Sequence, residues 1–148
     1  MCAGALTASL ALRPCTTLAN HVPINARNIG ADEHESHFVF DMIYNNSTDI
    51  QPYIHSTDSH GTNPVNFALL HVFGRQFAPR YKDLCDKVRT SLTGFNHPGS
   101  YGDAILRPVR KIRENDIIRE WDECRRIFVS LAMKETTQST IVRKLKYL

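Results

Sequence analysis

Asp58 is the residue of this chain whose type and position most suggest chemistry. It lies where the alternating pattern of a strand ends and the pattern of an apolar helix begins. A carboxylate at the carboxyl end of a strand occupies the position at which open α/β sheets bind ligands, so we predict that Asp58 holds a metal ion. His55 and His60 lie on either side of it and could hydrogen-bond the carboxylate or approach a phosphate. Taken without its surroundings, Asp58 is more typical of a turn or capping residue than of a catalyst.

The segments that flank Asp58 have clear structural signals. Residues 50–57 alternate in side-chain character, which is the period of a strand. Gly61 favours a turn. Asn63 can cap a helix with Pro64 at its first position, and Gly74 follows its end. Because residues 65–73 are apolar nearly all round, we expect this helix to be buried.

Two histidines form a second candidate site. His34 and His37 are three residues apart and could both reach a metal ion. The segment HESHF, however, does not have the H-E-x-x-H pattern, and nothing nearby supplies a third ligand. A role at the surface is therefore the favoured interpretation.

The remaining acidic clusters have ordinary explanations. Asp32, Glu33 and Glu35 are expected to begin a helix. Glu120, Asp122 and Glu123, which flank Trp121, are expected to form the solvated face of a later helix. The sequence contains neither a G-x-S-x-G motif nor a Gly-rich phosphate loop, so hydrolase and nucleotide-binding functions have no support.

Further elements are predicted on both sides of this region. Residues 22–26 alternate as a strand, with Pro23 suited to an edge or a strand start. Asp32 and Glu35 have capping-box spacing before a short helix whose apolar face ends at Asn45; that face comprises Phe38, Val39, Met42 and Ile43. Residues 76–78 form a possible short strand stopped by Pro79.

The C-terminal part is predicted to be helical. Residues 81–111 are rich in turn formers and show the least regular pattern. From Asn115 to Leu131, apolar residues recur every three or four positions, which indicates a helix of about five turns. Trp121 on this stripe is expected in the core rather than as a base-stacking platform. A second helix follows from about Gln138. Its predicted buried side carries Ile141, Leu145 and Leu148, and its predicted solvent-exposed side carries Arg143, Lys144 and Lys146.

The charge of the chain is unevenly distributed. Residues 1–74 carry two basic and six acidic side chains, a balance of −4, whereas residues 75–148 carry sixteen and nine, a balance of +7. The second half is therefore the candidate nucleic-acid face. Its candidates form two clusters: Arg75, Arg80, Lys82, Lys87 and Arg89, followed by Arg107, Arg110, Lys111 and Arg113. The simpler interpretation is that these charges only solvate the surface.

The cysteines and the N-terminus exclude several classes. Cys2, Cys15, Cys85 and Cys124 are scattered without a C-x-x-C pair, so we expect reduced thiols in a cytosolic protein rather than a zinc site or disulfide framework. The opening MCAGALTASLAL is too short and lacks an early positive charge, which argues against a signal peptide or a membrane span. Residues 1–15 are expected to be an unmatched segment with an unnatural start, as a truncated gene would produce.

Several segments of the chain carry a resemblance to a known family. They are STDSHGTNPVNFALLHVFGRQFAPRYKDL, ANHVPINARNIGADEHESHFVFD, YGDAILRPVRKI and REWDECRRIFVSLAMKETTQSTIVRKL. Together they resemble the catalytic domain of the large replicative transposases of the Tn-three family of bacterial transposons, from about Thr16 to Leu148. The resemblance implies that residues 16–148 are a partial DDE domain, which is an α/β, RNase H-like core, here incomplete and followed by a C-terminal helical portion.

The resemblance also implies a chemistry. Two Asp and one Glu of such enzymes hold two Mg²⁺ ions, which promote hydrolysis at the transposon end and then attack of the freed 3′-hydroxyl on target DNA. Asp58 matches the second Asp, while the first Asp and the Glu have no counterpart in this chain. The polypeptide is therefore expected to be inactive alone, and its status as an enzyme is uncertain.

Partners follow from the same resemblance. We expect DNA as the partner, a homo-oligomer for the complete enzyme, no membrane association and a cytoplasmic location in a bacterium. The basic residues then become candidates for phosphate contact. Two alternatives remain: a noncatalytic DNA-binding remnant, whose DNA affinity would persist in Asp58→Ala, and a folded protein of unrelated interaction function.

Overall fold

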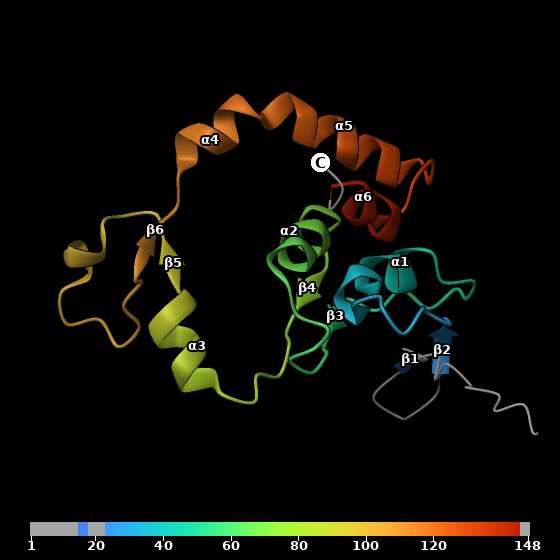
Figure 1. The fold of residues 1–148 in the computed structure, drawn as a ribbon, viewed down its shortest axis with the longest axis horizontal. Coiled ribbons are helices and arrows are strands. Elements are labelled where there is room, and N and C mark those ends of the chain that lie inside the picture. Colours follow the sequence, from blue (N-terminus) through green and yellow to red (C-terminus); the bar gives the residue numbers. More distant parts are fainter. Residues whose placement is uncertain (1–14, 18–22, 146–148) are drawn as a thin grey trace, which may run out of the picture. The chain divides into compact units, whose positions relative to one another are not determined.

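The computed structural model describes residues 15–17 and 23–145, which form two compact units (Figure 1). Unit 1 comprises residues 1–79 and 137–148, and unit 2 comprises residues 80–136. The chain thus leaves unit 1 after Pro79 and rejoins it at Thr137. Asp58 belongs to unit 1. Each unit is described by itself.

Unit 1 contains two small sheets. Strand β1 (Cys15–Thr17) pairs antiparallel with β2 (Pro23–Ala26), with an irregularity between Thr16 and Thr17. This confirms the strand predicted at residues 22–26 over its described part, while Val22 lies outside the described residues. Strand β3 (Ile54–His55) pairs parallel with β4 (Gln76–Phe77). The strand predicted at 76–78 is therefore confirmed, and Ala78 still donates its N–H to His55 O at 2.8 Å.

The strand predicted at residues 50–57 is much shorter than expected. Only two residues, those of β3, belong to the ladder. Before them, the guanidinium of Arg75 binds Pro52 O at 2.6 Å and also the side chain of Gln51, so a side chain fixes this segment instead of a neighbouring strand. After them, the chain bends towards Asp58. The prediction was wrong in extent because alternation of side chains does not show where backbone partners end.

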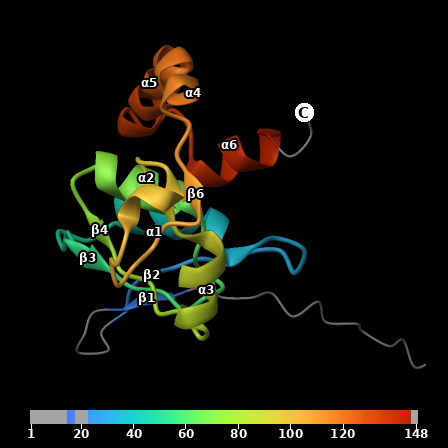
Figure 2. The same cartoon turned by 90° about the vertical axis from the view of Figure 1, so that its left-hand side faces the viewer.

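The described part of unit 1 also contains four helical segments: η1 (Glu35–His37), α1 (Val39–Tyr44), α2 (Pro64–Val72) and α6 (Gln138–Leu145). Helix α1 lies against both α2 and α6 (Figures 1 and 2). The core forms between these helices. It is made of apolar side chains from α1, the residue before it and α2, namely Phe38, Val39, Phe40, Met42, Ile43, Leu69 and Leu70. The predicted apolar face of the short helix is thus confirmed.

The start of this helical region differs from the prediction. The expected capping box between Asp32 and Glu35 does not form. Instead, the Nδ1 atom of His34 accepts the backbone N–H of Ser36 at 3.3 Å, which makes His34 the N-cap of η1. Asp32 lies in the preceding turn, in which Glu33 accepts the N–H of Gly30 at 3.2 Å.

Helix α2 confirms its predicted ends but not its predicted burial. Asn63 accepts the N–H of Asn66 at 2.9 Å, Pro64 is the first residue, and Gly74 follows with a φ of +72°. Only Asn66, Leu69 and Leu70 of the helix are buried. The expectation of all-round burial was wrong because unit 1 covers one face of α2; its other face exposes Val65, Phe67 and Val72.

Unit 2 is more regular than its sequence suggests. The stretch expected to be least regular contains helix α3 (Leu84–Ser91), a 3-10 turn η2 (Pro98–Tyr101) and two short strands. Those strands, β5 (Thr93–Gly94) and β6 (Arg110–Lys111), pair in parallel. Several of the turn formers that obscured this pattern lie within these elements, with Gly94 in β5 and Pro98 and Gly99 in η2. Residues 95–109 connect the two strands.

The long helix predicted from Asn115 to Leu131 is divided in two. Helix α4 (Glu114–Arg119) ends at Glu120, whose ψ of 10° breaks the helical path, and α5 (Trp121–Ala132) follows. Of the apolar stripe, Leu131 is buried whereas Trp121 is 47 % exposed. The placement of Trp121 in the core was therefore wrong, because this end of the stripe has too few side chains packed over it in unit 2.

Helix α6 begins at Gln138 as predicted, but its buried residues are different. Gln138 and Ser139 are buried, whereas Leu145 is 60 % exposed. The assignment of Leu145 to the buried side was wrong because unit 1 holds this helix by its polar first turn. Ile141 is half-buried, and Arg143 and Lys144 are exposed as expected. Lys146 and Leu148 lie outside the described residues.

The described part of the chain combines helices with strands, and the strands form three two-stranded sheets. The α/β class is thus confirmed at this level. Within the described residues, no helix is long and apolar enough to cross a membrane. Cys85 and Cys124 carry free thiols. Most of the segment 1–15 lies outside the described residues.

Candidate active site

Asp58 lies in the turn that connects β3 to α2. Its Oδ1 atom accepts the backbone N–H of His60 at 2.9 Å and that of Gly61 at 3.4 Å. Its own carbonyl oxygen accepts the hydroxyl of Thr62 at 3.1 Å. The side chain is nevertheless 69 % exposed. One carboxylate oxygen is therefore fixed by the backbone, and the other, Oδ2, points to a region that solvent reaches.

The turn also sets the charge of this carboxylate. The backbone N–H of His60 is the main cause that lowers the pKa of Asp58, and the Gly61 N–H and the His60 ring act in the same direction. The His60 Nδ1 atom lies 3.5 Å from Oδ2. Because these donors favour the charged form, Asp58 is ionised at neutral pH, as a metal ligand must be.

Gly61 gives the turn its shape. A Cβ atom at this position would lie 2.7 Å from the Cβ and 2.8 Å from the hydroxyl oxygen of Thr57. Both distances are shorter than side-chain atoms tolerate, so glycine allows the chain to pass close to Thr57. The Gly61 carbonyl oxygen accepts the side-chain amide of Asn66 at 2.9 Å, which ties the turn to the buried face of α2.

His55 precedes the turn on β3. Its ring stacks on Phe77 of the paired strand, with centroids 6.3 Å apart. Burial lowers the pKa of His55 to about 4 from its ordinary 6.5. His55 is therefore neutral at physiological pH, which makes it a packing residue of the sheet here rather than a cationic partner of Asp58.

Asp58 is not grouped with further ligands in the part of the chain that the structure describes. No set of three or more His, Cys, Asp or Glu side chains there could hold a metal ion. Glu33 instead pairs with Arg143 of α6. The acidic residues around Trp121 pair with arginines of the same helical region, as expected for a solvated face: Glu120 with Arg119, Asp122 with Arg125 and Glu123 with Arg126.

The two histidines considered as metal ligands have local contacts. His34 caps η1, and its ring lies 5.7 Å from that of His37. Both line a shallow cavity of about 300 Å³ in unit 1, together with residues of α6 such as Val142 and Arg143. The capping role gives His34 a structural explanation that needs no metal.

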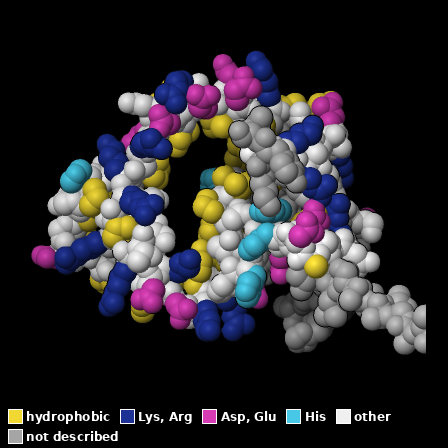
Figure 3. All heavy atoms as spheres, viewed as in Figure 1, with side chains coloured by type: hydrophobic (Ala, Val, Ile, Leu, Met, Phe, Trp, Pro, Cys, Tyr) yellow, Lys and Arg dark blue, Asp and Glu magenta, His cyan; other side chains and the backbone are white. Residues whose placement is uncertain are grey.

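The candidate DNA-contacting residues fall into two groups. Arg75 belongs to unit 1 and is half-buried, with its guanidinium bound to Pro52 and Gln51, so the structure gives it a role in fixing the segment before β3. The other candidates belong to unit 2 and are exposed: Arg80, Lys82, Lys87, Arg89, Arg107, Arg110, Lys111 and Arg113. Figure 3 shows lysine and arginine side chains gathered on the face of unit 2 around α3, β5 and β6.

These exposed candidates differ in how they are engaged. Arg107 approaches Asp103 at 3.8 Å, and Arg113 approaches Asp116 at 3.2 Å. Four of the candidates form neither an ion pair nor a hydrogen bond through their side chains with any described residue, and these are Lys87, Arg89, Arg110 and Lys111. Cations without an acidic neighbour are the better candidates for phosphate contact, because no intramolecular pair must be broken first.

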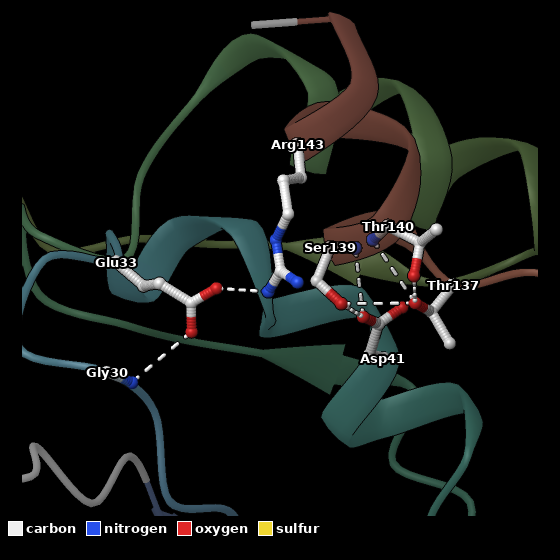
Figure 4. Close-up of polar contacts among 7 residues, drawn as sticks. All are labelled: Gly30, Glu33, Asp41, Thr137, Ser139, Thr140 and Arg143. Carbon is white, nitrogen blue, oxygen red and sulfur yellow. Dashed lines mark hydrogen bonds and ion pairs between the residues drawn. The ribbon is translucent and has the colours of Figure 1, made fainter. Parts of the chain in front are cut away.

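The sequence analysis missed a buried polar cluster in unit 1. Asp41 of α1 is 3 % exposed, and its carboxylate accepts the backbone N–H groups of Gln138 and Ser139 at 2.6 and 3.0 Å and the Ser139 hydroxyl at 2.7 Å. Figure 4 shows the first turn of α6 directed at this carboxylate. Asn66 and Gln138 are buried nearby. A single polar residue inside an apolar run, as in FVFDMIY and PVNFALL, was the available signal.

Comparison with known proteins places these features in a family. The profile of the family described as "Tn3 transposase DDE domain" matches residues 15–147. The chain is 29 % identical over 128 residues to the transposase for transposon Tn3926 and 31 % over 125 residues to that for Tn2501, both from Escherichia coli. These alignments cover 84 % and 83 % of this chain.

The chain corresponds to a small part of these relatives. It spans 12 % of the length of either Escherichia coli protein, and the same share of the Tn501 transposase of Pseudomonas aeruginosa, to which it is 28 % identical. No solved structure matches it significantly. The family match nevertheless covers nearly the whole chain, including the Asp58 turn. This chain therefore belongs to the Tn3 transposase DDE domain family.

Proposed function

We propose that this chain is part of the catalytic domain of a replicative DDE transposase, and that Asp58 is one ligand of its catalytic Mg²⁺ ions. The observation that carries the proposal is the Asp58 turn. Two backbone N–H groups hold Oδ1, the pKa is lowered, and the side chain is 69 % exposed. The family relationship supports DNA transposition as the general process.

Asp58 is suited to be one ligand of a Mg²⁺ ion. Mg²⁺ is a hard cation that prefers carboxylate oxygens, and Oδ2 of Asp58 is the oxygen that no backbone N–H holds, with the His60 ring 3.5 Å away. When bound, the two metal ions of such a site activate the attacking oxygen and stabilise the leaving oxygen of an in-line phosphoryl transfer. One carboxylate cannot organise two hydrated ions. We therefore propose that Asp58 acts together with further carboxylates, and that the 148-residue chain alone performs no strand transfer.

The other parts of the proposal concern DNA and assembly. Unit 2 supplies cations for DNA phosphates, foremost Lys87, Arg89, Arg110 and Lys111, which have no acidic partner among the described residues. The domain adopts the RNase H-like arrangement of DDE enzymes, and the complete enzyme works as a homo-oligomer on DNA in the bacterial cytoplasm. The parallel pairing of β3 and β4 around α2 is compatible with such a core.

Metal-directed cleavage of the polypeptide tests the role of Asp58 without requiring transposition. Fe²⁺ can occupy Mg²⁺ sites and, with ascorbate and peroxide, cuts the chain beside its ligands. We expect cuts within residues 57–62, suppressed by excess Mg²⁺ and lost in Asp58→Asn. The matched control is Asp49→Asn, which alters another exposed carboxyl of unit 1 and should keep the cuts.

The same experiment separates the two candidate functions. Cuts that persist in Asp58→Asn, or that follow every exposed carboxylate equally, contradict a metal-ligand role for Asp58. If such a result accompanies salt-dependent DNA binding that Asp58→Ala leaves unchanged, the noncatalytic DNA-binding remnant becomes the better description.

A further inference from the structure

A line of buried side-chain amides connects α6 to the turn that carries Asp58. Gln138 Nε2 donates to Asn66 Oδ1 at 2.6 Å, and Asn66 Nδ2 donates to Gly61 O at 2.9 Å. Gly61 in turn donates its backbone N–H to Asp58 Oδ1 at 3.4 Å. Gln138 is 1 % and Asn66 0 % exposed, so water does not substitute for these contacts. The proposed metal ligand is thus linked to a residue 80 positions further along the chain, at 138 against 58.

Backbone groups fix the direction of this line at both ends. Asn66 Nδ2 faces two carbonyl oxygens, those of Gly61 and Ser36, each at 2.9 Å. Carbonyl oxygens only accept, so the amide nitrogen must point to them and Oδ1 must point to Gln138. At the other end, Phe40 donates its N–H to Gln138 Oε1 at 3.0 Å, which leaves Nε2 to face Asn66. Neither amide can rotate without bringing like groups together.

The position of Gln138 is set independently of this line. Asp41 accepts the backbone N–H groups of Gln138 and Ser139, which anchors the first turn of α6 on α1. Figure 4 shows the contact of Asp41 with Ser139. The side chain of Gln138 therefore extends towards Asn66 from a fixed base. A buried polar network in which every member is satisfied holds a single arrangement, because any alternative leaves a buried donor or acceptor without a partner.

We propose that Asn66 and Gln138 are positioning residues for Asp58, which hold the Gly61 peptide so that its turn presents the carboxylate in one orientation. This inference rests on the proposed function of Asp58 and deepens it. Its consequence is that the geometry of the metal-ligand turn depends on α6. Because residues 80–136 lie between β4 and α6 in the chain, the turn reaches its final geometry only after that whole segment has been synthesised and the chain has rejoined unit 1.

Hydrogen exchange measured by mass spectrometry on the full chain tests this dependence. Gln138→Met keeps the length of the side chain but leaves Asn66 Oδ1 and the Phe40 N–H without partners. We expect exchange in peptides covering residues 57–62 to become about tenfold faster or more, as expected when buried hydrogen bonds are lost. Asn66→Asp, which retains an acceptor for Gln138 but loses the donor to Gly61, should have the same local effect.

The matched control is Ser139→Ala. It removes the hydroxyl bound to Asp41 at the same first turn of α6 but does not touch Asn66. A purely structural role of Gln138 predicts that both variants accelerate exchange over all of unit 1 to a similar degree. The proposal predicts a selective effect of Gln138→Met on residues 57–62, and an equal effect of the two variants there overturns it.

A measurement on the unaltered chain covers the case in which Gln138→Met does not fold. In increasing urea, the amides of residues 57–62 and those of the first turn of α6 should open together, with the same dependence on urea concentration. Opening of the turn while α6 remains protected overturns the proposal. Loss of Fe²⁺ cleavage at residues 57–62 in Gln138→Met would show that the line of buried amides also affects metal binding. Absence of such cleavage in the unaltered chain would contradict the proposed function but leave the exchange test intact.

Discussion

The carboxylate of Asp41 and the first turn of α6 meet at Ser139, which donates both its backbone N–H and its hydroxyl to Asp41 Oδ2, at 3.0 and 2.7 Å. The two residues are 98 positions apart. Asp41 thereby caps a helix from outside that helix, at the point where the chain returns from unit 2. The contact joins the two chain segments from which unit 1 is built.

Replacing Asp41 by Asn should destabilise unit 1. The side-chain amide has the same shape, but its NH₂ group would face donors where the carboxylate now accepts three hydrogen bonds. We expect the free energy of unfolding to fall by about 1–3 kcal/mol, the cost of leaving buried groups unpaired. Urea denaturation followed by circular dichroism measures this. Asp49→Asn, at an exposed position, should change stability little, and equal losses in both variants would refute the capping role of Asp41.

Gly61→Ala should strain the turn that holds Asp58. The added methyl group would lie 2.7 Å from Thr57 Cβ, closer than such atoms approach. We expect a loss of about 1–3 kcal/mol in the free energy of unfolding, as for overpacked sites. At Gly99 the nearest atom to an added Cβ is 3.6 Å away, so Gly99→Ala serves as the control in the same urea titration. A Gly61→Ala chain as stable as Gly99→Ala would show that the turn can widen freely.

The stability of unit 1 should decrease as the pH falls from 6.5 to 4. The folded chain keeps His55 neutral down to about pH 4, whereas an ordinary histidine in the unfolded chain binds a proton near 6.5. Between these values the unfolded state binds more protons, so its population rises as the pH is lowered. Thermal melts across this range should show a shallower dependence for His55→Phe, which keeps an aromatic ring against Phe77. His71→Gln, on the exposed side of α2, should retain the full dependence of the melting temperature on pH. If His71→Gln reduces this dependence as much as His55→Phe does, His55 is not its cause.

The basic residues of unit 2 should contribute to DNA binding through phosphate contacts. Alanine at the four candidates that have no acidic partner within residues 15–17 and 23–145, namely Lys87, Arg89, Arg110 and Lys111, should weaken binding to a short duplex. The slope of log K against log salt should become shallower by about 1 for each phosphate interaction that is removed. Fluorescence anisotropy at several salt concentrations measures both quantities.

Two arginines of α5 provide the control for this prediction. Arg125 and Arg126 are paired with Asp122 and Glu123, at 3.6 and 3.1 Å. Their replacement by alanine should leave the salt slope nearly unchanged. If alanine at Arg125 and Arg126 reduces the slope as much per residue as alanine at the four candidates does, the DNA contacts are non-specific. Lys87, Arg89, Arg110 and Lys111 would then have no special role in DNA binding.

Local signals in the sequence were sufficient for the ends of some elements. Asn63, Pro64 and Gly74 determined the start and end of α2 because capping and positive φ depend on the residue itself. The start of α6 near Gln138 was also predicted, from the spacing of the apolar residues that follow it. Family membership was also accessible from sequence, because long segments around Asp58 retain recognisable motifs.

Burial and long-range pairing were decided only by the tertiary structure. Trp121 and the outer face of α2 are apolar in sequence but exposed, because burial depends on what other segments cover them. The contacts of Asp41 with Ser139 and of Asn66 with Gln138 join residues 98 and 72 positions apart. Periodicity describes only neighbours within a helix or strand. The sequence therefore determined which carboxylate is the candidate ligand, and the folded chain determined which buried amides hold its turn.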